Sequence, residues 1–207
     1  LNKYGYASKV ELMRNHLKLV KEILDEEGLE AMMWSDMHFT AARDEGVYHP
    51  DCILTPEILA AAPENIGLVY WDYYHEDNAS YANMLQKHAQ FKAKTIFAGG
   101  IWTWCGPAAD YRKTLAATLP ALEECVKAGV KEVFATCWGD DGAECNLYTL
   151  QYGLAIFGEY NYTGHWDAEE AEKRFRASSG MDAQAFLTIS KLNELPGLVR
   201  QPNSTAN

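Results

Sequence analysis

The sequence predicts an α/β protein built as the C-terminal half of a (β/α)8 TIM barrel, with four parallel strands, their helices and short C-terminal helices after them. Three observations lead to this prediction. Short apolar runs of strand length recur four times along the chain. Helix-like segments, with apolar residues at three- and four-residue spacing, alternate with them. The strand-like runs are apolar at nearly every position, which is typical of parallel strands covered by helices.

The first helix is predicted between Ser8 and Gly28. Ser8 followed three residues later by Glu11 has the pattern of a capping box, and Gly28 is a typical helix end. The core-facing stripe has helical spacing and consists of Val10, Met13, Leu17, Val20 and Leu24, widened by Leu12, Leu19 and Ile23. Residues 31–36 then form a short apolar run with a polar end, which predicts a buried strand.

The same alternation continues to the end of the chain. A polar connection covers residues 37–65, Pro120 predicts a kink in one helix, and Gly129 ends that helix. The tail at 201–207 is polar and is expected to be frayed. The predicted strands are 66–72, 94–98 and 133–138, and the predicted helices are 56–62, 80–91, 111–126, 147–157, 168–178 and 182–192.

A chain of 207 residues fits a single domain. We expect residues 1–157 to form half of a (β/α)8 barrel and residues 158–207 to form a helical extension and tail. An open doubly wound sheet is the alternative architecture, but no G-x-G-x-x-G or P-loop motif follows any of the predicted strands.

The composition excludes several classes of protein. The 18 Lys and Arg against 29 Asp and Glu give a net charge of −11, which argues against nucleic-acid binding. No apolar run is long enough to cross a membrane, and the N-terminus has no signal-peptide pattern, so a cytoplasmic location is expected. The five cysteines include no closely spaced pair, so neither zinc nor another metal or cofactor is expected. The missing initiator Met suggests a piece of a longer protein.

The strand ends carry the strongest functional signal. In parallel α/β folds the functional groups gather at the carboxyl ends of the strands. Here all four predicted ends are aromatic and three also carry acids: Trp34 with Asp36, Tyr70 with Asp72, Trp102 with Trp104, and Trp138 with Asp140 and Asp141. Indole rings stack against the apolar C–H faces of sugars, and carboxylates accept hydrogen bonds from sugar hydroxyls. The pattern therefore favours a carbohydrate site.

Several motifs resemble those of family 20 glycoside hydrolases, and most closely the bacterial β-N-acetylhexosaminidases. They are Lys3-Tyr4-Gly5-Tyr6, His16-Leu17, Gly28-Leu29, Met33-Trp34-Ser35-Asp36-Met37, Tyr70-Trp71-Asp72 and Trp138-Gly139-Asp140. The resemblance covers nearly the whole chain. It implies hydrolysis of terminal β-linked N-acetylglucosamine or N-acetylgalactosamine, with the acetamido oxygen of the substrate as nucleophile and a Glu as general acid.

The resemblance also implies roles for individual residues. Tyr70 would hydrogen-bond the acetamido carbonyl, and Asp72 would bind near the sugar or hold a catalytic partner. Trp138 would stack under the sugar ring. Trp34, with one or both of Trp102 and Trp104, would form the walls of the acetamido pocket. Asp140 would bind the outer hydroxyls of the sugar, and Asp141 and Glu144 are the substitutes for this role.

The acid pair of the family, Asp-Glu at the end of the fourth strand, has no counterpart here. Asp25-Glu26 lies near a helix end and Asp44-Glu45 in a loop, and neither follows an apolar strand. No catalytic residue is therefore expected in this chain, the acid pair being placed upstream of Leu1. The expected partners are an N-acetylhexosamine glycan and the missing N-terminal half of the barrel. A second copy is also expected, because the sheet edges and an inner face of Met32, Val69 and Phe97 would lack cover.

Two alternatives remain open at this point. One is a barrel hydrolase of another family whose acids lie within this chain, such as Asp36 with Asp72 or Asp140. The other is a half-barrel that binds carbohydrate without catalysis. The loop histidines His38, His49 and His75 are more readily explained as ordinary polar residues, and those within helices as structural.

Overall fold

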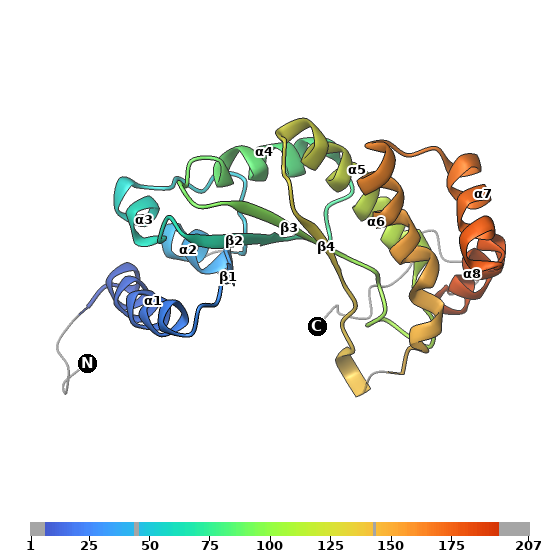
Figure 1. The fold of residues 1–207 in the computed structure, drawn as a ribbon, viewed down its shortest axis with the longest axis horizontal. Helices are drawn as coiled ribbons and strands as arrows, with labels where there is room; N and C mark the ends of the chain where they lie inside the picture. The colour runs from blue at the N-terminus through green and yellow to red at the C-terminus, as the bar shows by residue number, and fades with distance from the viewer. Residues whose placement is uncertain (1–6, 44–45, 143, 195–207) are drawn as a thin grey trace. The chain divides into compact units, whose positions relative to one another are not determined.

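The computed structural model describes residues 7–43, 46–142 and 144–194, and within them the chain is an α/β protein with one sheet of four parallel strands (Figure 1). The strands lie in the sheet in their sequence order: β1 (Ala31–Trp34), β2 (Ile66–Trp71), β3 (Thr95–Gly100) and β4 (Val133–Thr136). Parallel neighbours require a connection that returns along the sheet, and helices supply it. The predicted α/β class with parallel strands is thus confirmed.

Most helices begin and end close to their predicted positions. The α-helices are α1 (Lys9–Glu26), α2 (Asp36–Ala42), α3 (Pro56–Ala61), α4 (Asn78–His88), α5 (Tyr111–Ala128), α6 (Gln151–Thr163), α7 (Ala168–Ser179) and α8 (Ala183–Ser190). Short 3₁₀ turns are η1 (Asp140–Gly142), η2 (Leu147–Leu150) and η3 (Lys191–Asn193). The sequence reading missed α2, and α5 continues through Pro120. The tail at 201–207 and Asp44-Glu45 lie outside the described residues.

The chain divides into two compact units. Unit 1 comprises Leu1–Trp71, Ala79–Phe97 and Ala128–Glu132, and unit 2 comprises Asp72–Asn78, Ala98–Lys127 and Val133–Asn207. The division passes through β3. The expected change from barrel half to extension at residue 157 stays a prediction.

A buried serine at the end of β1 organises the core of unit 1. Ser35 Oγ lies 2.9 Å from the carbonyl oxygen of Val69 and 2.8 Å from both the Tyr48 hydroxyl and His88 Nε2. His88 Nδ1 donates to the carbonyl oxygen of Met84 at 2.8 Å. One hydroxyl therefore joins β1, β2, α4 and the loop before α3, and it satisfies polar groups that burial would otherwise leave unpaired.

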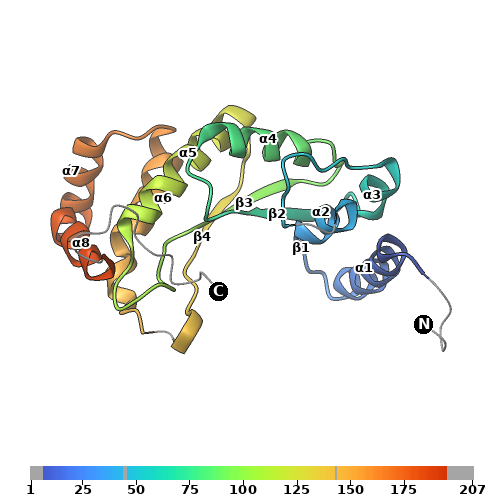
Figure 2. The same ribbon diagram turned by 180° about the vertical axis from the view of Figure 1, so that it is seen from behind.

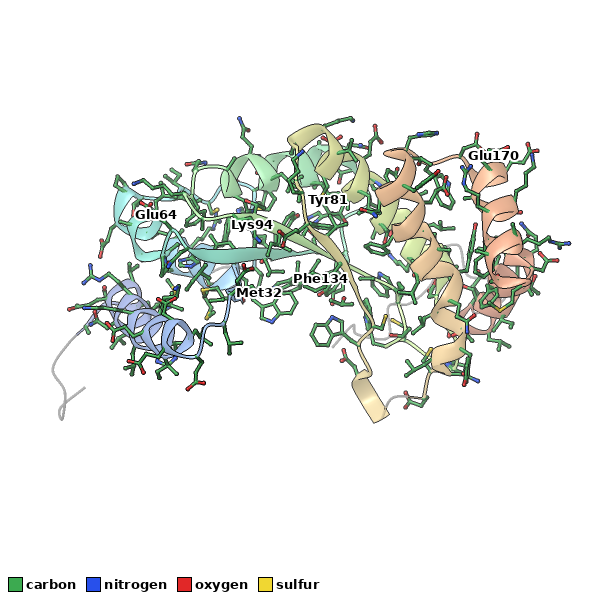
Figure 3. The ribbon with its side chains drawn as sticks, viewed as in Figure 1. Met32, Glu64, Tyr81, Lys94, Phe134 and Glu170 are labelled. Atoms are coloured by element: carbon green, nitrogen blue, oxygen red, sulfur yellow. The ribbon has the colours of Figure 1, made fainter. Side chains whose placement is uncertain are left out.

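The two faces of the sheet in unit 1 have different surroundings. On the α4 side, the Tyr70 ring packs against Tyr81 and Phe97, with ring centroids 6.5 and 5.4 Å apart. Met32 lies on the opposite side, as Figure 3 shows, and is 63% exposed. The expected inner face of Met32, Val69 and Phe97 is therefore wrong for Phe97, which lies among the helix-facing residues.

Helix α1 forms where its pattern predicts, but little of its apolar stripe is buried. Ser8 caps it by accepting a hydrogen bond from the backbone N–H of Glu11 at 3.1 Å. Leu17 is its one buried residue. Along α1 and the segment after it, large apolar side chains exposed by half or more are Leu12, Leu19, Ile23 and Leu29. Because α2 and α3 contact α1 from one side, the periodicity predicts the helix but not what covers it.

Unit 2 contains a smaller helical core. Helix α6 contacts α7, and α7 contacts α8, as Figure 2 shows from behind. Rings from the three helices meet, with Phe175 5.2 Å from Tyr152 and 5.5 Å from Phe186. Gly164 and Gly180 end α6 and α7 with φ near +73°, a conformation that glycine adopts without strain. Within the described residues, none of the helices combines the length and the apolar character that crossing a membrane requires.

Two buried histidines in unit 1 make its stability depend on pH. His38 and His88 are both fully buried, and burial lowers the pKa of each to about 4. Neither ring nitrogen of His38 has a hydrogen-bond partner. Between pH 6.5 and 4 the unfolded chain therefore binds more protons than the folded chain, so stability falls as the pH falls through this window.

We predict that acidification from pH 6.5 to 4 costs roughly 3 kcal/mol of unfolding free energy for each of these histidines. His38→Leu should remove about half of the combined loss from the two histidines, because it deletes one of the two buried groups that stay neutral in the folded protein. Urea midpoints measured across this pH window test the prediction. The control His16→Gln, on the exposed surface of α1, should leave the slope unchanged. An identical slope for His38→Leu and the wild type would contradict the prediction.

Candidate functional site

The segment after β2 is held by one buried carboxylate in unit 2. Asp72 is 5% exposed, and its Oδ1 accepts hydrogen bonds from the backbone N–H groups of Tyr74 at 3.0 Å and His75 at 3.3 Å. Its Oδ2 lies 2.6 Å from His75 Nδ1. This hydrogen bond raises the pKa of His75. An aspartate that bonds the backbone two residues ahead forms a compact turn, so β2 ends sharply at this point.

Two stacked tryptophans follow β3. The rings of Trp102 and Trp104 are 4.7 Å apart with an interplanar angle of 29°, and they are 1% and 3% exposed. Tyr73 lies 5.4 Å from Trp104, and Tyr74 meets Trp102 edge to face at 5.5 Å. The four rings, which we call the aromatic cluster, therefore come from the ends of two neighbouring strands.

Gly100 makes room for this cluster. A Cβ atom at Gly100 would lie 2.7 Å from Trp104 Cη2 and 2.8 Å from Tyr73 Cδ1, closer than side-chain atoms approach one another. Any side chain at this position would push both rings away from the strand end. Gly100 thus has a packing function that periodicity alone did not indicate.

The two stacked indoles differ in their hydrogen bonding. Trp102 Nε1 donates to the carbonyl oxygen of Tyr73 at 3.0 Å. Trp104 Nε1 is buried and has no hydrogen-bond partner. A buried N–H group without an acceptor is uncommon in folded proteins and costs about 1–3 kcal/mol. Trp104 therefore carries a buried donor that has no acceptor among the described residues.

The end of β4 adds a more accessible aromatic residue to unit 2. Trp138 is 41% exposed, and its carbonyl oxygen accepts a hydrogen bond from Thr103 Oγ1 at 2.7 Å. The Tyr73 side chain interacts with Thr136 and Trp138, although burial still raises its pKa. Asp140 begins η1 and is exposed, and its charge is among those that raise the pKa of Tyr74, where burial contributes most.

The remaining expected site residues lie in unit 1. Trp34, at the end of β1, is partly exposed. Tyr70 is fully buried in the core, where its ring stacks on His88 at 4.8 Å. A ligand contact by Tyr70 would require this core to open, and the proposed role stays a prediction. Its neighbour Trp71 is partly exposed instead, and Trp71 Nε1 donates to Asp36 Oδ1 at 3.2 Å.

Asp72, Trp102, Trp104, Trp138 and Asp140 all belong to unit 2, whereas Trp34 and Tyr70 belong to unit 1. The sequence analysis did not select Trp71, Tyr73, Tyr74 or His75. Consecutive residues of a strand point to opposite faces. The alternation along β2 could therefore have indicated that Trp71 lies on the face opposite Tyr70. Across the described residues, no group of three or more His, Cys, Asp and Glu side chains is arranged to hold a metal ion.

In comparisons with known proteins, the chain matches no family model and no curated protein sequence. The chemistry of the strand ends is therefore the main guide to what the protein does.

We predict that Trp102→Phe and Trp104→Phe differ in their effect on stability, although both remove similar ring area from a buried position. Trp102→Phe leaves the carbonyl oxygen of Tyr73 without its donor, whereas Trp104→Phe removes an N–H group that has no acceptor. Trp102→Phe should therefore cost about 1–2 kcal/mol more of unfolding free energy. Urea unfolding of the two variants measures the difference, and equal or reversed losses would contradict the prediction.

Proposed function

We propose that this chain is the C-terminal half of the catalytic barrel of a family 20 glycoside hydrolase and supplies the sugar pocket of an exo-β-N-acetylhexosaminidase. Its substrates would be glycans with a terminal β-linked N-acetylglucosamine or N-acetylgalactosamine. The main support is the aromatic cluster at the strand ends of unit 2, with the half-exposed Trp138 and the exposed Asp140 in the same unit.

The chemistry of a sugar matches these groups. The exposed Trp138 ring offers an apolar surface for the C–H face of a pyranose, and the Asp140 carboxylate accepts hydrogen bonds from hydroxyls. A small set of polar groups on an otherwise aromatic surface is typical of sites for small neutral ligands.

In this proposal the reaction is retaining and substrate-assisted, and the general acid comes from outside this chain. The carboxylates of Asp25-Glu26 suit the role poorly. Both residues lie in the exposed last turn of α1, and Asp25 is paired with Lys21. A catalytic acid instead needs a protected position beside the leaving oxygen.

One alternative is a glycosidase of another family that uses Asp72 as its acid. Three hydrogen bonds occupy the Asp72 carboxylate, and its side chain is 4% exposed. A group held in this way is poorly placed to protonate a leaving oxygen. The other alternative, a half-barrel that binds sugar without catalysis, differs from our proposal only in whether the complete protein turns substrate over.

The partners that we propose are the other half of the barrel and, for the isolated chain, a second copy. In unit 1, Met32 on the sheet and Leu12, Leu19 and Ile23 on α1 are 51–63% exposed. β1 is also the first strand in the sheet order. An edge strand beside exposed apolar side chains favours pairing with another chain. A cytoplasmic location is also part of the proposal.

We predict that the chain binds N-acetylglucosamine but does not hydrolyse a chromogenic N-acetylglucosaminide, because a general acid contributes about 10²–10⁴-fold to such a rate. Trp138→Ala should weaken binding about tenfold through lost stacking. The control Tyr162→Ala, on the exposed face of α6, should not change binding. Isothermal titration and a hydrolysis assay test both points. Hydrolysis that disappears when an acid of this chain is changed would refute the proposal.

We predict that the isolated chain forms a dimer at micromolar concentration and that Leu19→Glu with Ile23→Glu makes it a monomer. The two charges would lie on the exposed apolar side of α1, where burial against a second copy would be costly. Sedimentation velocity measures the outcome. Leu154→Glu, an exposed leucine on α6, serves as the control and should leave the dimer intact. A folded wild-type monomer over the whole concentration range would contradict the prediction.

A further inference from the structure

The turn after β2 contains a histidine with the geometry of a functional group. The His75 side chain is 46% exposed, whereas the Asp72 side chain that binds it is 4% exposed. Because an ionised carboxylate only accepts hydrogen bonds, the 2.6 Å contact fixes the proton of the neutral ring on Nδ1. The other ring nitrogen, Nε2, then lies on the edge of the ring that points away from Asp72, and the Asp72 carboxylate sets the orientation of the ring.

Asp72 is itself held rigidly. Its Oδ1 accepts hydrogen bonds from the backbone N–H groups of Tyr74 and His75, and its own backbone N–H donates to the carbonyl oxygen of Ala98 on β3 at 3.3 Å. The carboxylate is therefore fixed to the sheet before it binds the ring. A buried carboxylate that orients an exposed imidazole is the arrangement by which proteins prepare a histidine to donate or accept a proton.

An exposed aromatic surface lies next to this histidine. Tyr74 is 49% exposed, and its ring meets the buried Trp102 edge to face. Lys113 Nζ lies 5.7 Å from the centre of the Trp102 ring, and it is paired with Glu76 at 2.7 Å. Tyr74 directly precedes His75 in the turn that Asp72 holds, so two half-exposed rings come from this one turn.

The charges around this surface indicate which kind of ligand fits. The carboxylates of Asp72 and Asp77 act on His75, and those of Asp72 and Asp140 act on Tyr74 together with the Tyr73 and Cys105 side chains. The cation of Lys113 is occupied by Glu76. An anionic ligand would meet several carboxylates, so a neutral sugar is favoured. Asp72 raises the pKa of His75 and extends the protonated form toward neutral pH.

We propose that His75 is a ligand-binding residue whose Nε2–H donates a hydrogen bond to an acceptor oxygen of a neutral sugar on Tyr74, and that Asp72 is its positioning residue. This inference rests on the sugar-binding function proposed above. In the imidazolium form both ring nitrogens are donors, whereas in the neutral form Asp72 keeps the proton on Nδ1 and Nε2 becomes an acceptor. The bond to an acceptor oxygen is therefore lost as His75 deprotonates.

The experiment measures N-acetylglucosamine affinity by titration from about pH 5.5 to about pH 8.5, roughly one unit below to two units above the ordinary histidine pKa, while NMR follows the protonation of His75. We expect affinity to fall about tenfold as His75 deprotonates, the loss of one hydrogen bond. His75→Gln should bind with an affinity independent of pH. Asp72→Asn, which keeps an acceptor for the two backbone N–H groups, should move the fall in affinity to lower pH.

His165→Gln is the control, because His165 is an exposed histidine of the same unit, and it should retain the wild-type profile. Wild-type binding without pH dependence, or His75→Gln with an unchanged profile, would overturn this inference and leave the proposed function standing. Absence of any N-acetylglucosamine binding by the wild type would overturn the proposed function and this inference with it.

Discussion

Parallel strand pairing is the constraint on which the rest of this structure depends. Parallel neighbours cannot be joined by a tight turn, so each connection must return along the sheet, and helices provide that path. The same alignment brings the ends of β1 and β2 together in unit 1, where Ser35 joins both strands to α4. In unit 2 it brings the residues after β2 against those after β3, where Tyr73 meets Trp104 and Trp102. Polar and aromatic groups far apart in the sequence become neighbours for this reason.

The two strand-end clusters use buried polar groups differently. In unit 1 the Ser35 hydroxyl satisfies several partners and leaves a closed core, which is a structural arrangement. In unit 2 Asp72 also satisfies several donors, but one of them is an exposed histidine. The Trp104 N–H group in the same unit has no partner among the residues that the structure describes. The Ser35 hydroxyl is therefore paired within the core, whereas the groups after β2 and β3 include a half-exposed ring and an indole N–H without an acceptor among the described residues.

Much of the fold follows from the sequence, and the site follows only in part. The Ser8 cap, the glycine helix ends and the apolar strand runs predicted α1, β2, β3 and α5 closely, because these signals act over a few neighbouring residues. The motif reading selected Tyr70 for ligand contact, yet its ring lies against α4 and Trp71 is partly exposed instead. His75 was set aside as an ordinary polar residue. Its proposed role depends on Asp72, and no spacing rule reveals how deeply that carboxylate is buried.

The sequence by itself determined the class of fold, the order of its elements and the concentration of aromatic and acidic residues at the strand ends. These properties are local, because they arise from periodicity, capping and residue type within short windows. Only the tertiary structure decided which of those residues are buried, which are paired and which remain accessible. In the folded chain Trp102 stacks on Trp104, and the Trp102 indole N–H has an acceptor in the carbonyl oxygen of Tyr73. The buried Asp72 carboxylate lies against the ring of the exposed His75. Burial and pairing depend on atoms contributed by several elements at once, so one segment of sequence cannot specify them.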